Sequence, residues 1–391
     1  MGGLTGLVQG SVAGPGELGL SLERMDRIEE TDTLGRTMRV EAGATLQRVQ
    51  EAAAREGLQF ALDLGARGSA AIGGNAATNA GGNRVIRYGM MRDMILGLEA
   101  VLADGTVIPA LNRMIKNNAG YDLKQLFIGT EGTLGVVTRL VLRLRPMPLS
   151  SQTALLGCSS FVQVTGLLGR LDALLGGAMS SFEVMWRDFF TLVTSPPAKG
   201  RDPLGGEHPF YVIVEAQGGD PASDPARFEA ALAVAAEEGG YADAVIASSE
   251  AQRDAIWALR DDVAQLFRLG HPFVFDVSLP VAEMEGYVAE VHAGFAARMP
   301  AQRCFTFGHL GDGNLHFVVV GPAGPEARAA VEEIVYRPLA ARAGSISAEH
   351  GIGLEKKPWL ALSRSESEIA LMRRLKQALD PRGILNPGRV I

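Results

Sequence analysis

The chain has few cysteines and no long apolar run. Only two of its 391 residues are cysteine, Cys158 and Cys304, and they fit neither a disulfide scaffold nor a C-x-x-C motif. This favours a reducing compartment, and we predict a cytoplasmic protein. No apolar stretch approaches the roughly 18 residues that a transmembrane segment needs. The opening MGGLTGLVQG also lacks the basic and apolar regions of a secretory signal.

The chain also lacks an excess of positive charge. Its 37 Lys and Arg are outnumbered by 44 Asp and Glu, which gives a formal net charge of −7. A nucleic-acid partner would need a basic face, so none is expected. Glycine, in contrast, is abundant at 48 residues. This abundance indicates many tight turns, or places where the backbone closely approaches a ligand.

The length and local patterns predict two domains. A chain of 391 residues exceeds one typical core. The prolines and serines of RPMPLSS mark a boundary near residue 148, which separates 1–147 from 148–391. Helices are expected at 45–57, 161–175, 225–239, 249–270 and 281–298. Strands are expected around the Asp-Gly turn of 97–108, late in 126–146, and at 210–218, 273–280 and 316–321. Alternating strands and helices with short turns predict an α+β fold for the second domain.

Three segments rich in small residues stand out in the first domain, at 2–7, 64–82 and 129–135. Backbone N–H groups in such loops can bind phosphate without basic side chains. No G-x-G-x-x-G motif follows a strand and opens a helix, so a Rossmann site is not predicted. Ordinary turn glycines are the alternative interpretation.

Two short loops in the second domain concentrate histidine and carboxylate. His309 and His316 flank the turn in GHLGDGNLHF, and Glu349 and His350 are adjacent in SAEHGIG. A lone histidine is usually structural, but the GDGN turn would let both imidazoles face one point. Two imidazoles and one carboxylate leave coordination positions open, as catalytic metal sites require. Such ligands suit Zn²⁺, Mn²⁺ or Fe²⁺, and the sequence does not choose among them.

Five segments, in this order, resemble one known family: IGGNAATNAGGNRVIRYGMMRD, LFIGTEGTLGVVT, GHLGDGNLH, SAEHGIG and DPRGILNPGRV. The chain resembles the FAD-linked 2-hydroxy-acid dehydrogenases, which include D-lactate dehydrogenase, the glycolate oxidase flavin subunit and D-2-hydroxyglutarate dehydrogenase. They belong to the vanillyl-alcohol-oxidase-type flavoprotein superfamily.

The resemblance implies an α+β protein with two domains. Residues 1–147 would form a vanillyl-alcohol-oxidase-type (PCMH-like) FAD-binding domain. Residues 148–391 would form an α+β, ferredoxin-like FAD-linked oxidase C-terminal domain, with the last roughly 40 residues packing back toward the flavin. Relatives carry a further N-terminal lobe, so we expect the FAD-binding domain to be N-terminally incomplete here.

The resemblance also implies which residues bind FAD. No histidine precedes residue 208, so FAD should be held non-covalently. The residues that match the family's FAD-binding positions are Gly2, Gly3, Thr5, Gly6, Leu7, Leu64, Gly65, Ser69, Gly73, Gly74, Asn75, Thr78, Asn79, Gly82, Glu131, Gly132, Gly135, Val137 and Asn386.

By the same resemblance, the second domain carries the chemistry. His309, His316 and Glu349 would hold a divalent metal, with zinc preferred over manganese or iron, and His350 would be the base. Arg260 would pair with the carboxylate of a small-molecule 2-hydroxy acid; a surface helix arginine is the alternative interpretation. The implied electron acceptor is an electron-transfer flavoprotein or a quinone, and a homodimer is left open.

Three positions depart from the 2-hydroxyglutarate type that the chain resembles. Ala264, Val274 and Val318 replace polar or cationic residues. This predicts a D-2-hydroxy acid with a small or apolar tail, closer to lactate than to 2-hydroxyglutarate. Two other functions are considered. One is a metal-dependent hydrolase using His309, His316 and Glu349, which would leave the glycine-rich loops without a purpose. The other is a catalytically degraded flavoprotein subunit.

Overall fold

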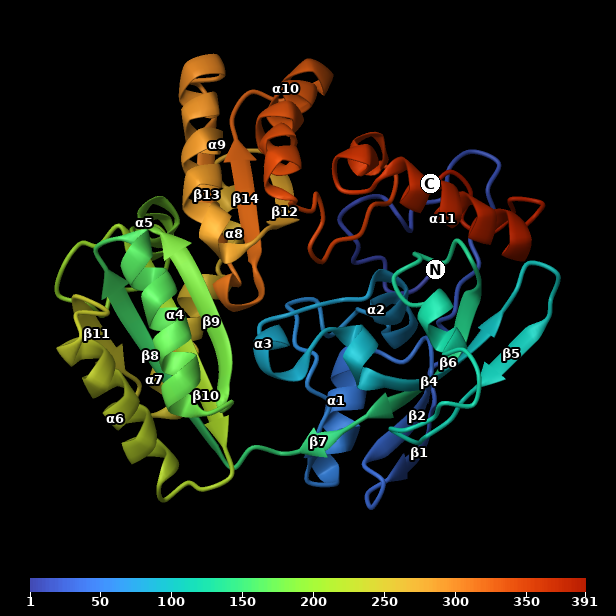
Figure 1. Ribbon diagram of the computed structural model, residues 1–391, viewed down its shortest axis with the longest axis horizontal. Helices are drawn as coiled ribbons and strands as arrows, with labels where there is room; N and C mark the ends of the chain where they lie inside the picture. Colours follow the sequence, from blue (N-terminus) through green and yellow to red (C-terminus); the bar gives the residue numbers. More distant parts are fainter. The chain divides into compact units, whose positions relative to one another are not determined.

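The chain forms two compact units in a computed structural model that describes residues 1–391 (Figure 1). The first unit combines residues 1–147 with the C-terminal segment 349–391, and the second consists of residues 148–348. Both units combine helices with antiparallel sheet, which confirms the predicted α+β class. None of the helices has the length and apolar character needed to cross a membrane.

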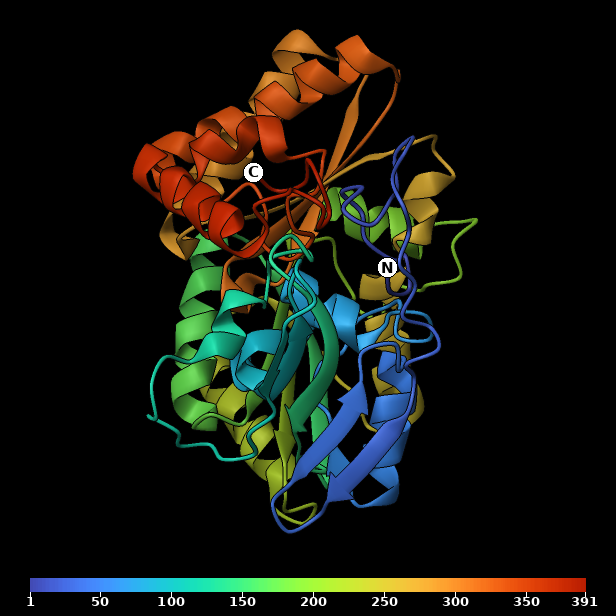
Figure 2. The ribbon, with the colours of Figure 1, turned by 90° about the vertical axis from the view of Figure 1, so that its right-hand side faces the viewer.

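The first unit is built on a five-stranded antiparallel sheet of order β1-β2-β6-β4-β5, with a separate β3-β7 pair. Its strands are β1 Ile28–Asp32, β2 Thr37–Glu41, β3 Leu58–Gln59, β4 Ile95–Val101, β5 Val107–Ala110, β6 Val136–Arg143 and β7 Arg145–Pro146. Its α-helices are α1 Leu46–Arg55, α2 Ile72–Thr78, α3 Val85–Tyr88 and α11 Glu366–Leu379, and its 3₁₀ turns are η1 Met91–Met94, η2 Leu123–Leu126 and η6 Lys357–Leu362. Figure 2 shows the β1–β2 hairpin at one edge of this sheet.

Helix α1 covers the core of the first unit, as its sequence predicts. Thr45 caps it, because its hydroxyl accepts a hydrogen bond from the Arg48 amide at 3.4 Å. Leu46, Val49 and Ala53 recur at helical spacing and are fully buried against apolar residues of β2, β4 and β6. Their burial fixes the helix on the five-stranded sheet.

The second unit is built on a seven-stranded antiparallel sheet of order β11-β8-β10-β9-β13-β14-β12. Its strands are β8 Ser150–Cys158, β9 Met179–Trp186, β10 Phe210–Gly218, β11 Asp243–Ile246, β12 Phe273–Ser278, β13 Arg303–Gly308 and β14 Asn314–Val320. Its α-helices are α4 Phe161–Leu175, α5 Arg187–Thr194, α6 Asp224–Glu237, α7 Glu250–Asp261, α8 Ala264–Phe267, α9 Met284–Arg298 and α10 Pro325–Tyr336, and its 3₁₀ turns are η3 Val281–Glu283, η4 Leu310–Asp312 and η5 Arg337–Arg342.

Side-chain alternation gives this sheet two different faces. One face packs on α5 and α7, where Phe189 stacks on Phe307 with ring centroids 4.2 Å apart. The other face packs on α4, α6 and α9, and there Tyr287 meets Phe317 edge-on. Residues that share the first face with Phe307 include those that form the candidate site.

One predicted helix is wrong in its extent. The single helix expected at 249–270 is divided into α7, which ends at Asp261, and α8, which begins at Ala264. Asp262 leaves helical geometry at φ −79° and ψ 45°, and its carboxylate accepts a hydrogen bond from Gln265 at 2.8 Å. This local side-chain bond stabilises the break, which the apolar periodicity did not reveal.

Candidate active site

The β13–β14 hairpin carries both histidines of GHLGDGNLHF. His309 directly follows β13, and His316 is the third residue of β14. The hairpin is tight at Gly308, where a Cβ would lie 2.4 Å from the Asn314 carbonyl oxygen. Gly313 adopts φ +83°, a conformation that favours glycine. The turn brings the two imidazoles together as the sequence predicts, with ring centroids 5.1 Å apart.

The chain that leads to Glu349 is held against β12. Ser278 and Ser345 exchange two backbone hydrogen bonds, at 3.1 and 2.6 Å. The carboxylate of Asp276, a fully buried residue of β12, accepts a hydrogen bond from the Ala348 amide at 2.9 Å. These bonds fix the backbone immediately before Glu349.

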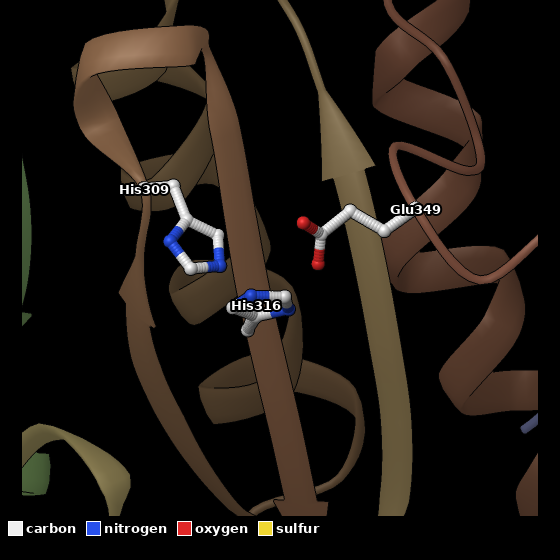
Figure 3. Close-up of side chains that lie close together, drawn as sticks. All are labelled: His309, His316 and Glu349. Carbon is white, nitrogen blue, oxygen red and sulfur yellow. The ribbon is translucent and has the colours of Figure 1, made fainter. Parts of the chain in front are cut away.

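The three predicted metal ligands converge (Figure 3). One ligand atom from each of His309, His316 and Glu349 lies within 4.8 Å of the other two, and both histidines are buried. A tetrahedral ion with bonds of about 2.1 Å holds its ligand atoms about 3.4 Å apart. Small side-chain rotations would close that difference, so the three residues fit a divalent metal with coordination positions left for substrate.

The carboxylate of Glu349 also lies against the glycine-rich segment 64–82. A Cβ on Gly81 would stand 2.6 Å from Glu349 Oε1. Only glycine leaves the carboxylate room to occupy this position. The segment predicted to cradle FAD therefore touches a predicted metal ligand.

A buried ionic cluster stands beside the first histidine. Glu183 Oε1 is 2.7 Å from His309 Nδ1, and Glu183 Oε2 accepts a hydrogen bond from Arg260 Nε at 2.9 Å. Arg260 Nη2 is 3.3 Å from His309 Nε2, and its guanidinium carbon lies 4.8 Å from the centre of the Phe307 ring. Glu183 is 1%, His309 5% and Arg260 6% exposed, so all three are shielded from water.

The cluster determines which nitrogen of His309 can bind a metal. Burial alone would raise the pKa of Glu183, but its interactions with His309 and Arg260 hold that pKa below the ordinary value. An ionised carboxylate only accepts hydrogen bonds, so His309 Nδ1 must carry the proton. The lone pair on Nε2 is then available, and in this structure Arg260 Nη2 donates to it. A metal and Arg260 would compete for that lone pair.

Asn314 lies on the same face of β14 as His316, two residues earlier. It is 3% exposed, and neither atom of its side-chain amide has a hydrogen-bond partner. A buried amide without partners is costly, so such a group indicates that a ligand or water completes the site. No role of Asn314 was predicted from the sequence.

The first unit offers a cradle lined by backbone. Gly3 packs so closely on the segment 64–82 that a Cβ would lie 1.8 Å from the Ser69 carbonyl oxygen. Gly65 and Gly74 instead face open space, because a Cβ at either position would have no atom within 4 Å. In Asn75, the residue after Gly74, the side-chain oxygen is buried and has no hydrogen-bond partner. An unpaired acceptor next to open backbone fits a ligand rich in hydroxyl, N–H and phosphate groups, as FAD is.

Two predicted FAD residues hold the chain together through their side chains. The Glu131 carboxylate accepts backbone hydrogen bonds from Ile352 at 2.6 Å and Gly353 at 2.9 Å. The Asn386 amide donates to the carbonyl oxygens of Glu131 and Gly10, at 2.6 and 3.0 Å. Both side chains thus fasten the C-terminal segment to the rest of the first unit.

Other predicted FAD residues also have internal partners. Asn79 Oδ1 accepts a hydrogen bond from the Arg92 amide at 2.9 Å, and the Thr78 hydroxyl donates to the Gly74 carbonyl at 3.1 Å. Val137 lies in the hydrophobic core, so only its backbone can face a cofactor. All nineteen predicted FAD residues nevertheless belong to the first unit.

The positions predicted to set substrate preference lie on the site face of the sheet. Val274 and Val318 stand directly opposite each other on β12 and β14, one side-chain pair beyond Asp276 and His316. Val318 is buried, Val274 packs on the same apolar cluster, and Ala264 begins α8. The paired valines place an apolar surface next to His316.

Glu183 and Asp276 are two residues of the site that the sequence did not predict. Glu183 meets His309 because β9 pairs with β13, a contact 126 residues apart along the chain. Asp276 stands opposite His316 because β12 pairs with β14. The available signal was a charged residue inside an otherwise apolar strand, in SSFEVMW and in FVFDVS.

Two family models match the chain. Residues 147–390 match the model described as FAD linked oxidases, C-terminal domain, and residues 1–110 match the one described as FAD binding domain.

Curated relatives match over the full chain. A mitochondrial D-2-hydroxyglutarate dehydrogenase of Bos taurus is 40% identical and is covered over 71% of its length. A D-2-hydroxyglutarate dehydrogenase of Xanthomonas citri pv. viticola is also 40% identical, with 83% covered. A putative mitochondrial D-lactate dehydrogenase of Schizosaccharomyces pombe is 38% identical, with 76% covered.

Solved structures share the fold at low identity. p-Cresol methylhydroxylase with substrate bound matches with a TM-score of 0.74 and 17% identity, over 94% of this chain and 78% of the other. Alkyldihydroxyacetonephosphate synthase matches with a TM-score of 0.71 and 15% identity, over 93% of this chain and 66% of the other. At such identities the match establishes the arrangement of elements alone.

Proposed function

Because this chain belongs to the FAD-linked oxidase family that includes the D-2-hydroxyglutarate dehydrogenases, we propose that it oxidises a D-2-hydroxy acid to the 2-oxo acid. The observation that carries the proposal is the meeting of two predicted features. Glu349 belongs to the His309–His316–Glu349 cluster, and its carboxylate lies against Gly81 of the predicted FAD cradle. A metal-dependent hydrolase would need the cluster but would leave the cradle without a purpose.

The reaction removes two hydrogens from the substrate. The Cα–H bond breaks with both electrons, the hydroxyl loses a proton, and a C=O bond forms. Bound FAD, held by the cradle around Gly74 and Asn75, would supply the hydride acceptor. A divalent metal, zinc by preference, held by His309, His316 and Glu349, would polarise the hydroxyl oxygen and lower its pKa.

The remaining steps use side chains of this chain. His350 adjoins the ligand Glu349 in the sequence, and we assign its imidazole as the acceptor of the hydroxyl proton. Arg260 would pair with the substrate carboxylate through its outer nitrogens, since Nε is occupied by Glu183. The unpartnered amide of Asn314 would donate a hydrogen bond to another substrate oxygen. Together these groups would orient Cα toward the hydride acceptor.

The substrate tail should be small or apolar. Val274 and Val318 form an apolar pair one step along the sheet from His316, where a distal carboxylate would lack a cationic partner. The second candidate substrate is D-2-hydroxyglutarate, a dicarboxylate, because two of the relatives are named as dehydrogenases of that acid.

Anaerobic titration of the purified yellow protein tests the function. D-Lactate and longer aliphatic D-2-hydroxy acids should bleach the flavin bands, with release of the matching 2-oxo acid. Faster bleaching by D-2-hydroxyglutarate than by these acids would reverse the assignment of the tail. A colourless protein that binds zinc would favour the hydrolase, and a yellow protein that no hydroxy acid bleaches would favour a degraded subunit.

The reduced flavin must pass its electrons on. We propose an electron-transfer flavoprotein or a quinone as acceptor, which stopped-flow reoxidation with each would distinguish. We also propose that the protein is cytoplasmic. Several relatives are named as mitochondrial, so fractionation of the host cell is needed to test this location. A homodimer is testable by light scattering.

A further inference from the structure

We propose that Glu183 is a positioning residue that joins the metal ligand His309 to the substrate-binding Arg260, giving one carboxylate oxygen to each. The inference rests on the proposed function, in which His309 holds a metal and Arg260 binds the substrate carboxylate. It concerns three residues of the second unit alone.

The register of the sheet puts Glu183 in this position. β9 and β13 are antiparallel neighbours that pair Met185 with Phe307 and Val184 with Gly308. The next pair in the same register is Glu183 with His309. The contact is therefore set by two neighbouring strands in the interior of a seven-stranded sheet.

The two oxygens of Glu183 divide their partners without overlap. Oε1 accepts a hydrogen bond from His309 Nδ1 at 2.7 Å, which directs Nε2 and its lone pair away from the carboxylate. Oε2 accepts a hydrogen bond from Arg260 Nε at 2.9 Å. The carboxylate of Glu183 thus determines both the tautomer of the His309 imidazole and the direction of the Arg260 guanidinium group.

Phe307 completes the support of the guanidinium. The centre of its ring lies 4.8 Å from the guanidinium carbon of Arg260. The guanidinium group is therefore in contact with Phe307 on one face and hydrogen-bonded to Glu183 at Nε. Nη2 is left near His309 Nε2, at 3.3 Å. A metal on Nε2 would displace Nη2, and the displaced N–H would become available to a substrate carboxylate.

Replacing Glu183 by glutamine tests the division of partners. Glutamine has the same shape but only one acceptor oxygen, and its NH₂ would face either His309 Nδ1 or Arg260 Nε. If it faces His309, the proton is driven onto Nε2, the atom that must bind the metal. If it faces Arg260, two donors oppose each other and the guanidinium turns away.

The matched control is Glu215→Gln. Glu215 is also buried in this sheet, at 1% exposed, but it binds Ser180 at 2.9 Å and Trp257 at 3.1 Å. Both variants lose one buried carboxylate, so effects of general destabilisation should be shared. Only Glu183→Gln alters a partner of His309.

The experiment measures Zn²⁺ affinity of the FAD-bound full chain by competition with a chromophoric chelator. If its NH₂ faces His309, Glu183→Gln should weaken Zn²⁺ binding about 10- to 100-fold, with flavin content unchanged, while Glu215→Gln binds Zn²⁺ like the wild type. Wild-type Zn²⁺ affinity together with a wild-type KM for the hydroxy acid in Glu183→Gln overturns the inference and leaves the metal site standing. A wild-type protein that binds neither Zn²⁺ nor Mn²⁺ overturns both.

A second readout separates positioning from metal loss. If the NH₂ of Glu183→Gln instead faces Arg260, Zn²⁺ binding should stay as in the wild type, while the KM for the hydroxy acid rises about tenfold because Arg260 is misdirected. Should Glu183→Gln not fold, Glu183→Asp takes its place. Its shorter side chain cannot reach both partners, so unchanged Zn²⁺ affinity and KM in that variant would also overturn the inference.

Discussion

Glu349 Oε1 occupies the space that a side chain on Gly81 would need, 2.6 Å from the position of a built Cβ. The first prediction follows from this contact. Gly81→Ala should push the flexible carboxylate aside, since the obstructing atom lies at the end of a rotatable side chain. We expect about tenfold weaker Zn²⁺ binding in a variant that still folds and holds FAD. Gly169→Ala in α4, where a Cβ meets nothing within 4 Å, is the control. Unchanged Zn²⁺ affinity in Gly81→Ala would remove Glu349 from the ligand set.

The second prediction concerns the histidine ligands. His309→Ala and His316→Ala should each abolish stoichiometric Zn²⁺ binding, measured by elemental analysis after dialysis, because two remaining ligands hold the ion poorly. The exposed His271 provides the matched variant, His271→Ala, which should keep its metal. Full occupancy in both ligand variants would contradict the assignment.

The third prediction concerns the base. His350→Ala should lower kcat by about 10²- to 10⁴-fold while the flavin spectrum and Zn²⁺ content stay as in the wild type. Added imidazole should restore part of the rate if the side chain only transfers a proton. A variant that loses its flavin instead would show that His350 is structural.

The fourth prediction concerns substrate preference. Val274→Lys should introduce a cation beside His316 and raise kcat/KM for D-2-hydroxyglutarate relative to D-lactate by about tenfold, the effect of one charge-assisted hydrogen bond. Val274→Met, which adds length without charge, is the control. An equal change for both acids would mean that the valine pair does not face the substrate tail.

The fifth prediction concerns acid stability of the C-terminal segment. Asp380 is buried and accepts hydrogen bonds from the Ile384 amide at 3.0 Å, the Leu385 amide at 2.8 Å and the Lys376 ammonium. Burial alone would raise the pKa of Asp380, but these bonds and the Lys376 charge hold that pKa below its ordinary value. The ionised carboxylate therefore stabilises the fold above the ordinary value of about 4, and this contribution is lost as the pH falls through the lower folded value.

Asp380→Asn should accordingly lower the free energy of unfolding by about 3 kcal/mol at pH 7. Urea denaturation at a series of pH values should show the gap between the two proteins closing below about pH 4. Asp172→Asn, at an exposed position of α4, should leave the curve unchanged. A gap that stays constant into acid would contradict the role of the Asp380 charge.

Some features that depend on residues close together in the sequence were predicted correctly. The Thr45 cap and the spacing of Leu46, Val49 and Ala53 were sufficient for α1, and GDGN was sufficient for the hairpin that joins His309 to His316. The break after Asp261 escaped prediction because a side-chain hydrogen bond from Gln265, rather than periodicity, ends the helix.

The supports of the site depend on pairing between distant strands. Glu183 reaches His309 only because β9 adjoins β13, and nothing near SSFEVMW indicates that neighbour. The sequence of the helix did not show whether Arg260 lies at the surface or binds substrate. Its burial and its hydrogen bond to Glu183 become visible only in the folded unit.

The first unit is assembled from residues 1–147 and 349–391, and Glu131 and Asn386 connect the two pieces. A ribosome delivers these pieces at different times, with the entire second unit emerging in between. Residues 148–348 form a unit of their own, which we expect to fold as soon as it has been made, whereas the first unit also needs residues 349–391. Until residues 349–391 have been made, the first unit lacks one of its two pieces, so we expect FAD to bind only after that segment has emerged.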